Sequence, residues 1–277
     1  MSGGWALAQD SGEYLFRAGG CWACHTDIKG GGPPLAGGRP LKTPFGIFYS
    51  PNITPDPDTG IGRWTVADFK RAMREGVRPD GAHYFPVFPY TTYSRMTDDD
   101  IGRLWAYLKS QPAVSRPNRL HDVAWPFSMR LLQGGWKLMF FSSGAYRAQP
   151  ARGAEWNRGA YLVEALTHCG ECHTPRNAMG GMDMGRWMAG TRDGPEGERA
   201  PNITPDKATG IGDWSVGDIV ELLKTGTKPD FDNIQGTMEE AVQHSLKYLT
   251  EADHKAIAAY FKALPAVVNK VPSGTAK

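Results

Sequence analysis

The chain has 277 residues, 40% of them hydrophobic, and its 31 basic and 29 acidic side chains leave a formal net charge of +2. This length predicts two domains of roughly 100–150 residues each. The charge is small and no basic run exceeds two residues, so we expect no nucleic-acid partner. No run of about 18 apolar residues occurs, so the sequence predicts no transmembrane helix.

The first residues contain Ala6-Leu7-Ala8, a small-x-small pattern typical of a signal-peptidase site. The charged and apolar regions that precede such a site in a complete signal are missing. We interpret residues 1–8 as the remnant of a trimmed export signal; the alternative is a disordered cytosolic N-terminus. Export predicts a periplasmic protein.

All four cysteines fall in two copies of Cys-x-x-Cys-His, which is the attachment pattern of c-type haem. Two thiols on one helical turn can each form a thioether with a haem vinyl group, and the next histidine lies under the ring. The pattern predicts two haem c groups, with covalent attachment through Cys21, Cys24, Cys169 and Cys172 and iron ligation by His25 and His173.

Three other uses of the cysteines compete with haem attachment. A disulfide framework gives no reason for a histidine after each second cysteine. A zinc site could use paired Cys-x-x-Cys motifs, but the two pairs lie in separate repeats. A thioredoxin-like redox pair requires a βαβ context, which is absent.

The chain repeats itself. Residues 51–56 recur identically as residues 201–206, and Thr-Gly-Ile-Gly followed by a tryptophan occurs after each copy. Amphipathic segments follow at 66–75 and 216–224, and closing helices are predicted at 98–109 and 251–263. Thr97 and Thr250 precede acidic first turns, which is typical of helix N-caps.

Helix, haem loop and closing helix are the plan of a class I cytochrome c. The sequence therefore predicts an all-α fold of two tandem class I cytochrome c domains, with long loops around covalently bound haems. We place the first domain at 9–114, an interdomain linker at 115–152, the second domain at 153–268 and a C-terminal tail at 269–277.

A methionine before each closing helix is the expected sixth iron ligand, so Met96 and Met238 are predicted to bind the two irons. Met73 falls on the apolar pattern of a helix and is expected in the core. His244 is the alternative to Met238. The second repeat also has methionines that follow His173 too closely to reach the opposite haem face: Met179, Met182, Met184 and Met188. Histidine–methionine ligation would make both haems electron relays.

Other haem contacts are suggested by the loops. Gly32-Pro33-Pro34-Leu35 resembles the Gly-Pro-x-Leu loop of class I cytochromes, in which a proline carbonyl accepts the N–H of the ligand histidine. The second repeat lacks that proline, so we expect its histidine to use another acceptor and the haem potentials to differ. Trp64 and Trp214 are predicted haem contacts, either as propionate donors or as wall residues.

Over residues 10–268 the chain resembles the cytochrome c subunit of membrane-associated bacterial alcohol, aldehyde and gluconate dehydrogenases. The resemblance is carried by residues 43–56, 86–96 and 155–164. It implies the ligand sets already given and a catalytic partner subunit with a quinone, flavin or molybdenum cofactor. It also implies that the chain is not an enzyme by itself but passes electrons to a cytochrome, an oxidase or a quinone.

The family usually has a third haem domain and a C-terminal membrane-binding segment, whereas this sequence has two haem motifs. We therefore expect a relay to another cytochrome or a terminal oxidase, with only peripheral membrane contact. The apolar segment 125–141 is expected to pack between the haem domains; the alternative is a docking surface. The alternative function is a di-haem enzyme, such as a peroxidase or a sulfur-compound oxidoreductase, with one open or labile iron.

Overall fold

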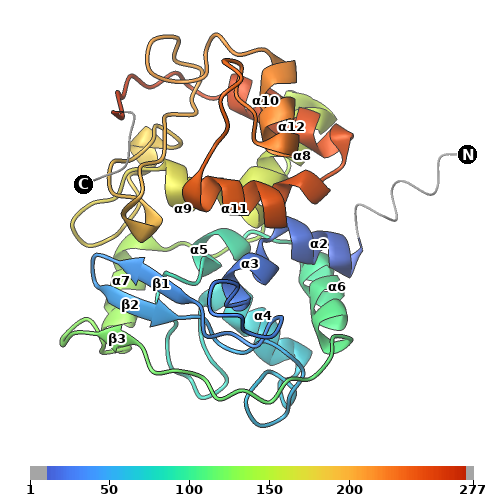
Figure 1. Ribbon diagram of the computed structural model, residues 1–277, viewed down its shortest axis with the longest axis vertical. Coiled ribbons are helices and arrows are strands. Elements are labelled where there is room, and N and C mark those ends of the chain that lie inside the picture. Colours follow the sequence, from blue (N-terminus) through green and yellow to red (C-terminus); the bar gives the residue numbers. More distant parts are fainter. Residues whose placement is uncertain (1–10, 273–277) are drawn as a thin grey trace, which may run out of the picture. The chain divides into compact units, whose positions relative to one another are not determined.

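The structure is a computed structural model that describes residues 11–272. The chain divides into two compact units, Met1–Ala145 and Tyr146–Lys277. Most of the regular structure in both is helical (Figure 1). The predicted signal remnant, residues 1–8, lies outside the described residues. Within them, no helix is long and apolar enough to cross a membrane.

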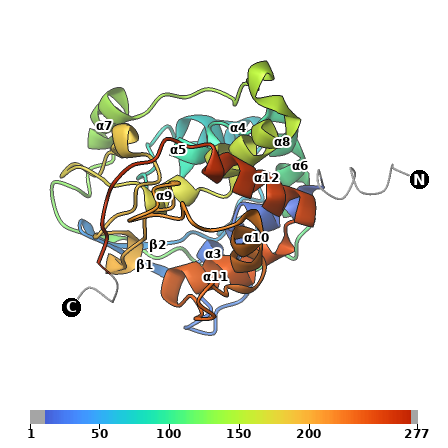
Figure 2. The same cartoon turned by 90° about the horizontal axis from the view of Figure 1, so that it is seen from above.

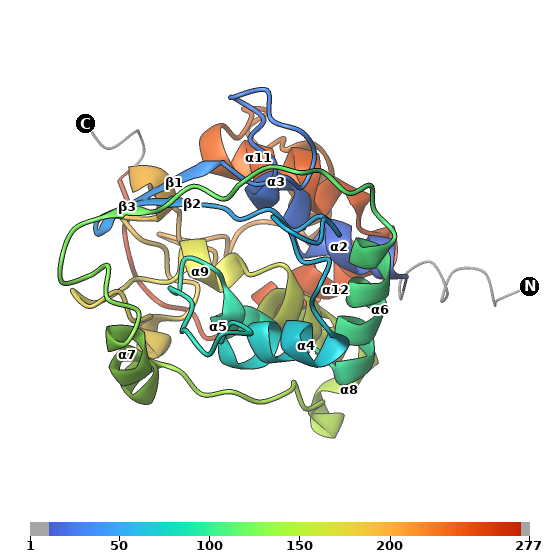
Figure 3. The same ribbon diagram turned by 90° about the horizontal axis from the view of Figure 1, so that it is seen from below.

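In the first unit the Cys-x-x-Cys-His turn forms the short helix α3, which contacts α2. Helix α2 packs along α6 (Figure 1 and Figure 3). A Cβ atom on Gly12 would lie 2.3 Å from the carbonyl oxygen of Arg103, so this crossing requires glycine. The helices are α2 (Gly12–Ala18), α3 (Cys21–His25), α4 (Val66–Glu75), α5 (Tyr90–Tyr93), α6 (Asp98–Lys109) and α7 (Leu132–Phe140).

A small antiparallel sheet, ordered β1-β2-β3, also belongs to the first unit. Its strands are β1 (Pro40–Thr43), β2 (Gly46–Tyr49) and β3 (Asp122–Val123). Its centre is Phe48 on β2, which is buried and packs against the ring of Phe85. The sheet departs from the all-helical expectation because β-branched and aromatic side chains in β2 favour a half-buried strand.

Part of the predicted linker packs on the first unit. Strand β3 pairs with β2, and helix α7 buries Trp136 and Lys137. The Lys137 ammonium donates to the carbonyl of Gly76 at 2.8 Å and lies over the ring of Tyr90. The other side of the segment is open, with Leu131 78% and Leu138 90% exposed. Packing of this segment between two haem domains, and the domain bounds 9–114 and 153–268, stay predictions.

The second unit repeats the helix order of the first. Helix α8 packs along α12 (Figure 1 and Figure 2). Gly159 makes the close approach here, since its Cβ would lie 1.9 Å from the carbonyl oxygen of Ala256. The helices are α8 (Gly153–Tyr161), α9 (Cys169–His173), α10 (Val216–Thr225), α11 (Gly236–His244) and α12 (Glu251–Lys262). The shorter turns are η1 (Pro150–Arg152), η2 (Leu162–Leu166), η3 (Met184–Arg186), η4 (Pro195–Gly197) and η5 (Leu246–Tyr248).

Polar caps fix where the long helices begin. The predicted N-caps are confirmed, because Thr97 accepts from the Asp100 amide and Thr250 accepts from the Asp253 amide. Helices α4 and α10 also begin with full capping boxes, which the sequence analysis missed. These pairs are Thr65 with Asp68 and Ser215 with Asp218. The predicted helix bounds agree with the structure to within one residue.

Candidate haem-binding sites

Each Cys-x-x-Cys-His motif forms a five-residue helix, α3 or α9. The residue before each helix, Gly20 or His168, has a left-handed conformation, so the chain turns sharply into the motif. None of the four cysteines is in a disulfide. No group of three or more histidine, cysteine or acidic side chains that could hold a metal ion occurs within residues 11–272.

The motif histidines are held in the same way in both units. The Nδ1 atom of His25 donates to the carbonyl oxygen of Pro51 at 2.8 Å, and that of His173 donates to the carbonyl oxygen of Pro201 at 2.8 Å. A carbonyl only accepts, so the proton sits on Nδ1 and leaves the Nε2 lone pair for a metal. Burial lowers the pKa of both imidazoles, which favours the neutral form that iron binds.

This result corrects the expectation about the proline acceptor. The acceptor in the first unit is Pro51 and not a proline of the Gly32–Leu35 loop, and the second unit has the equivalent Pro201. Both prolines begin the identical hexapeptide, so both histidines have the same partner. The proposed difference in potential between the haems loses its stated basis.

Glycines bring the hexapeptides close to the motifs. The amide of Gly37 donates to the carbonyl of His25 at 2.8 Å, and a Cβ atom on Gly37 would lie 2.4 Å from the carbonyl carbon of Pro51. Its φ of +69° also favours glycine. Gly190 makes the equivalent contacts, with His173 at 2.7 Å and a φ of +83°.

The loops that follow the motifs are equivalent despite different sequences. Leu35 and Met188 both have a positive φ, and the amide of each donates a hydrogen bond to a threonine hydroxyl, at 3.1 and 3.2 Å respectively. Met188 is fully buried in the place of Leu35. Met179 and Met184 are 52% and 62% exposed. Met188 is thus a buried packing residue, whereas Met179 and Met184 face solvent.

The predicted distal residue of the first unit, Met96, is fully buried between α5 and α6. Its amide donates to the carbonyl of Tyr93 at 3.0 Å. The Tyr93 hydroxyl donates to the carbonyl of Gly19 at 2.6 Å, which ties this segment to the turn before the haem motif. Met73 is buried on α4, as expected for a core residue.

The predicted distal residue of the second unit lies in a different setting. Met238 is partly exposed in the first turn of α11. The residue directly before Thr250, the N-cap of α12, is the buried Leu249. His244, the alternative ligand, lies partly buried at the end of α11. His254, which no sequence motif singles out, is buried, and its Nε2 donates to the carbonyl of Leu246 at 2.8 Å.

Trp64 and Trp214 are both partly buried, and their amides donate to the carbonyls of Ile61 and Ile211, each at 3.1 Å. A lysine of each closing helix donates a hydrogen bond to the turn before the tryptophan. Lys109 donates to the carbonyl of Gly62, and Lys262 donates to the carbonyl of Gly212. The two tryptophans therefore occupy equivalent places. Their role as propionate donors or wall residues stays a prediction.

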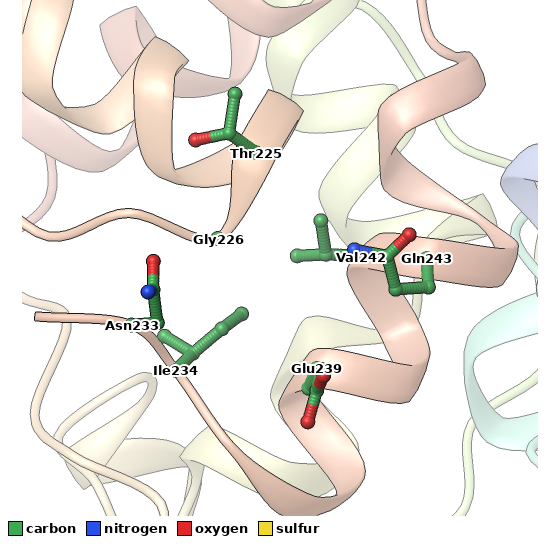
Figure 4. Close-up of a pocket in the computed structure, with 7 residues that line it drawn as sticks. All are labelled: Thr225, Gly226, Asn233, Ile234, Glu239, Val242 and Gln243. Atoms are coloured by element: carbon green, nitrogen blue, oxygen red, sulfur yellow. The ribbon is translucent and has the colours of Figure 1, made fainter.

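A pocket of about 280 Å³ lies between the end of α10 and α11 (Figure 4). It is lined by Thr225, Gly226, Asn233, Ile234, Glu239, Val242 and Gln243. None of the predicted haem residues lines it. The candidate sites are therefore defined by the two motif turns and not by this pocket.

Two such turns, each with a neutral histidine fixed through Nδ1, define the protein as a c-type cytochrome. The cytochrome c family matches residues 9–112. The chain is 46% identical to a diheme cytochrome c-type protein of Cereibacter sphaeroides, over 92% of this chain and 86% of that protein. The chain belongs to this family of cytochromes c.

Dehydrogenase subunits are also similar. The chain is 43% identical to the fructose dehydrogenase cytochrome subunit of Gluconobacter japonicus, over 92% of this chain and 52% of that protein. It is 40% identical to the cytochrome c subunit of the quinone alcohol dehydrogenase of Gluconobacter oxydans, over 96% of this chain and 58% of that subunit. The chain thus spans little more than half the length of these two subunits.

Proposed function

We propose that the protein is a di-haem c-type cytochrome that relays single electrons from the catalytic subunit of a dehydrogenase to a downstream respiratory acceptor. The observation that carries this proposal is the duplicated motif turn, in which each histidine donates from Nδ1 to a proline carbonyl at 2.8 Å. Such a bond fixes the ring orientation and makes the other nitrogen a better ligand.

The chain's residues fit a haem in each unit. Cys21 and Cys24 would attach the first haem, between His25 and Met96. The second haem would be held by Cys169, Cys172, His173 and Met238. When bound, each haem supplies an iron that cycles between two oxidation states one electron apart. Ligation of each iron by a histidine and a methionine would suit a relay.

The names of the relatives support a dehydrogenase partner, since several are cytochrome subunits of dehydrogenases that act on fructose, alcohol or gluconate. We propose an alcohol, an aldehyde or a similar compound as the substrate of the catalytic subunit. The downstream acceptor would be a cytochrome, an oxidase or a quinone. The Ala6-Leu7-Ala8 pattern supports export to the periplasm.

The test is the haem content of the purified chain and of two paired variants. Wild type should carry two covalent haems, and Cys21→Ala/Cys24→Ala and Cys169→Ala/Cys172→Ala should each carry one. Pyridine haemochrome absorbance and the mass of the denatured chain measure both quantities. Met184→Ala, at an exposed site, is the control and should keep two haems. A wild type with fewer than two covalent haems would contradict the proposal.

One observation favours a second candidate, a di-haem enzyme with one labile iron. Met238 is partly exposed, whereas Met96 is fully buried, so the second distal ligand is the easier one to displace. Carbon monoxide added to the reduced protein separates the two functions. An unchanged reduced spectrum supports a pure relay, and carbon monoxide binding at one haem supports the enzyme.

A further inference from the structure

The two units differ in the helix that leads into the haem motif. The first motif cysteine follows its tyrosine by seven positions in the first unit, Tyr14 to Cys21, and by eight in the second, Tyr161 to Cys169. The additional residue is absorbed by the π-helical turn η2. The amide of Thr167 closes this turn by donating to the carbonyl of Leu162 at 2.7 Å. Such π-turns are frequent at functional sites.

The π-turn carries Glu164, whose carboxylate accepts from a chain of two hydrogen bonds. The indole N–H of Trp187 donates to the Tyr260 hydroxyl at 3.1 Å, and that hydroxyl donates to Oε1 of Glu164 at 2.8 Å. Burial, together with the nearby carboxylate, raises the pKa of Tyr260. The phenol therefore stays protonated and serves as the donor to Glu164.

This network contacts the haem-attachment turn directly. A Cβ atom on Gly170 would lie 2.1 Å from the Trp187 ring, so the indole rests on the backbone between the two motif cysteines. The Thr167 hydroxyl, on the residue that closes the π-turn, lies 3.2 Å from the sulfur of Cys169. The residues around Glu164 are thus packed against the covalent attachment of the second haem.

The first unit has the opposite charge at the equivalent place. Arg17 follows Tyr14 by three positions, as Glu164 follows Tyr161. Arg17 pairs with Glu13 at 3.6 Å on the surface of α2. The position of Trp187 is taken by Pro34, which has no indole and no backbone N–H to donate. The first unit therefore has no equivalent of the Trp187 indole N–H at this position.

We propose that the negative charge of the Glu164 carboxylate gives the second haem a lower midpoint potential than the first. The ferric haem carries one more positive charge than the ferrous haem, so a fixed carboxylate nearby stabilises the oxidised state. This inference rests on the proposed function, because it requires a haem at each motif.

The experiment is a spectroelectrochemical titration of the holoprotein that resolves both midpoints. The single-haem cysteine variants assign each midpoint to its unit. Glu164→Gln keeps the hydrogen-bond acceptor and removes the charge, so the midpoint of the second haem should rise. We expect the ferrous form of that haem to gain on the order of threefold to tenfold in its equilibrium with the ferric form. The midpoint of the first haem should not change.

Three further variants separate charge from structure. Glu155→Gln removes an exposed carboxylate from α8 and should leave both midpoints unchanged. Glu164→Asp keeps the charge and should retain most of the low potential. Arg17→Gln should lower the midpoint of the first haem.

The results distinguish this inference from the function on which it rests. If the wild type carries two haems but Glu164→Gln and Glu164→Asp shift the midpoint of the second haem equally, the role of Glu164 is overturned and the proposed function stands. The same holds if neither variant shifts that midpoint. A haem count other than two in the wild type would overturn the proposed function itself.

Discussion

The two units are alike on the side of the motif histidine and unlike on the side of the predicted methionine. Behind each histidine lie the same proline carbonyl, the same close glycine and the same loop hydrogen bonds. In front, the first unit has the short helix α5 and a fully buried Met96. The second has the longer α11 and a partly exposed Met238.

This difference shows which parts of a repeated fold are constrained by chemistry. The histidine side must satisfy two cysteines, one histidine and a fixed acceptor at once, so few sequences keep that geometry. In the proposed function the opposite side would have to supply only one flexible side chain, and methionine can reach a target from several backbone positions. The distal segment can therefore change in length and in helix content while the motif turn stays the same.

The largest expected effect comes from the methionines. Met96→Ala should open the first iron to carbon monoxide and destabilise the unit by about 2–5 kcal/mol, because a fully buried side chain is lost. Met238→Ala should open the second iron at a smaller cost in stability, because this side chain is partly exposed. Carbon monoxide difference spectra and denaturant unfolding measure the two effects.

The exposed Met184→Ala serves as the control and should change neither measurement. Equal losses of stability for Met96→Ala and Met238→Ala would show that the distal sides are more alike than the structure indicates. If Met238→Ala does not increase carbon monoxide binding, this result counts against Met238 as a ligand of the second iron. His244 then becomes the candidate ligand.

Replacing the buried asparagines should have a smaller effect on stability than replacing Met96, and this effect should be equal in the two units. The amide of Asn52 donates to Thr59 at 3.0 Å and to the carbonyl of Val114 at 2.8 Å. Asn202 makes the matching bonds at 3.0 and 2.7 Å. Asn52→Ala and Asn202→Ala should each lower the free energy of unfolding by about 1–3 kcal/mol, because buried partners are left unpaired.

Denaturant unfolding of the holoprotein checks the asparagine variants, with the exposed Lys207→Ala as the control. If one asparagine variant loses stability and the other does not, the two units share the geometry around the motif histidine but not the energy of the hydrogen bonds there.

The smallest effect concerns the capping boxes and depends on pH. Hydrogen bonds from Thr65 lower the pKa of Asp68, and bonds from Ser215 lower that of Asp218, from the ordinary value of 3.8. The folded state therefore binds fewer protons than the unfolded state just below that value. Each carboxylate contributes its full stability above pH 3.8, and the contribution is lost as the pH falls through the lowered pKa.

Asp68→Asn and Asp218→Asn should thus differ from the wild type near neutral pH and approach it in acid. Thermal unfolding measured from about pH 2, well below the ordinary carboxyl pKa, up to about pH 7 checks this. Unequal pH profiles for the two variants would show that α4 and α10 are not anchored alike.

Much of this structure could be predicted from the sequence. The amphipathic pattern of residues 66–75 places α4, and the Thr97 cap places the start of α6, because both signals are local. The haem motifs are equally local, since their chemistry needs residues on one helical turn. The sequence did not reveal the small sheet, in which β3 pairs with β2 from 75 residues away (Ile47 with Asp122).

The sequence by itself determined the cytochrome class, the duplication and the histidines of the two motifs. Only the tertiary structure decided which proline accepts from each histidine, because Pro51 and His25 meet through a loop that no local pattern positions. It also decided that Glu164, Tyr260 and Trp187 form one chain of hydrogen bonds. These side chains are far apart in sequence and meet only because α8 packs on α12, so the contact depends on packing and not on propensity.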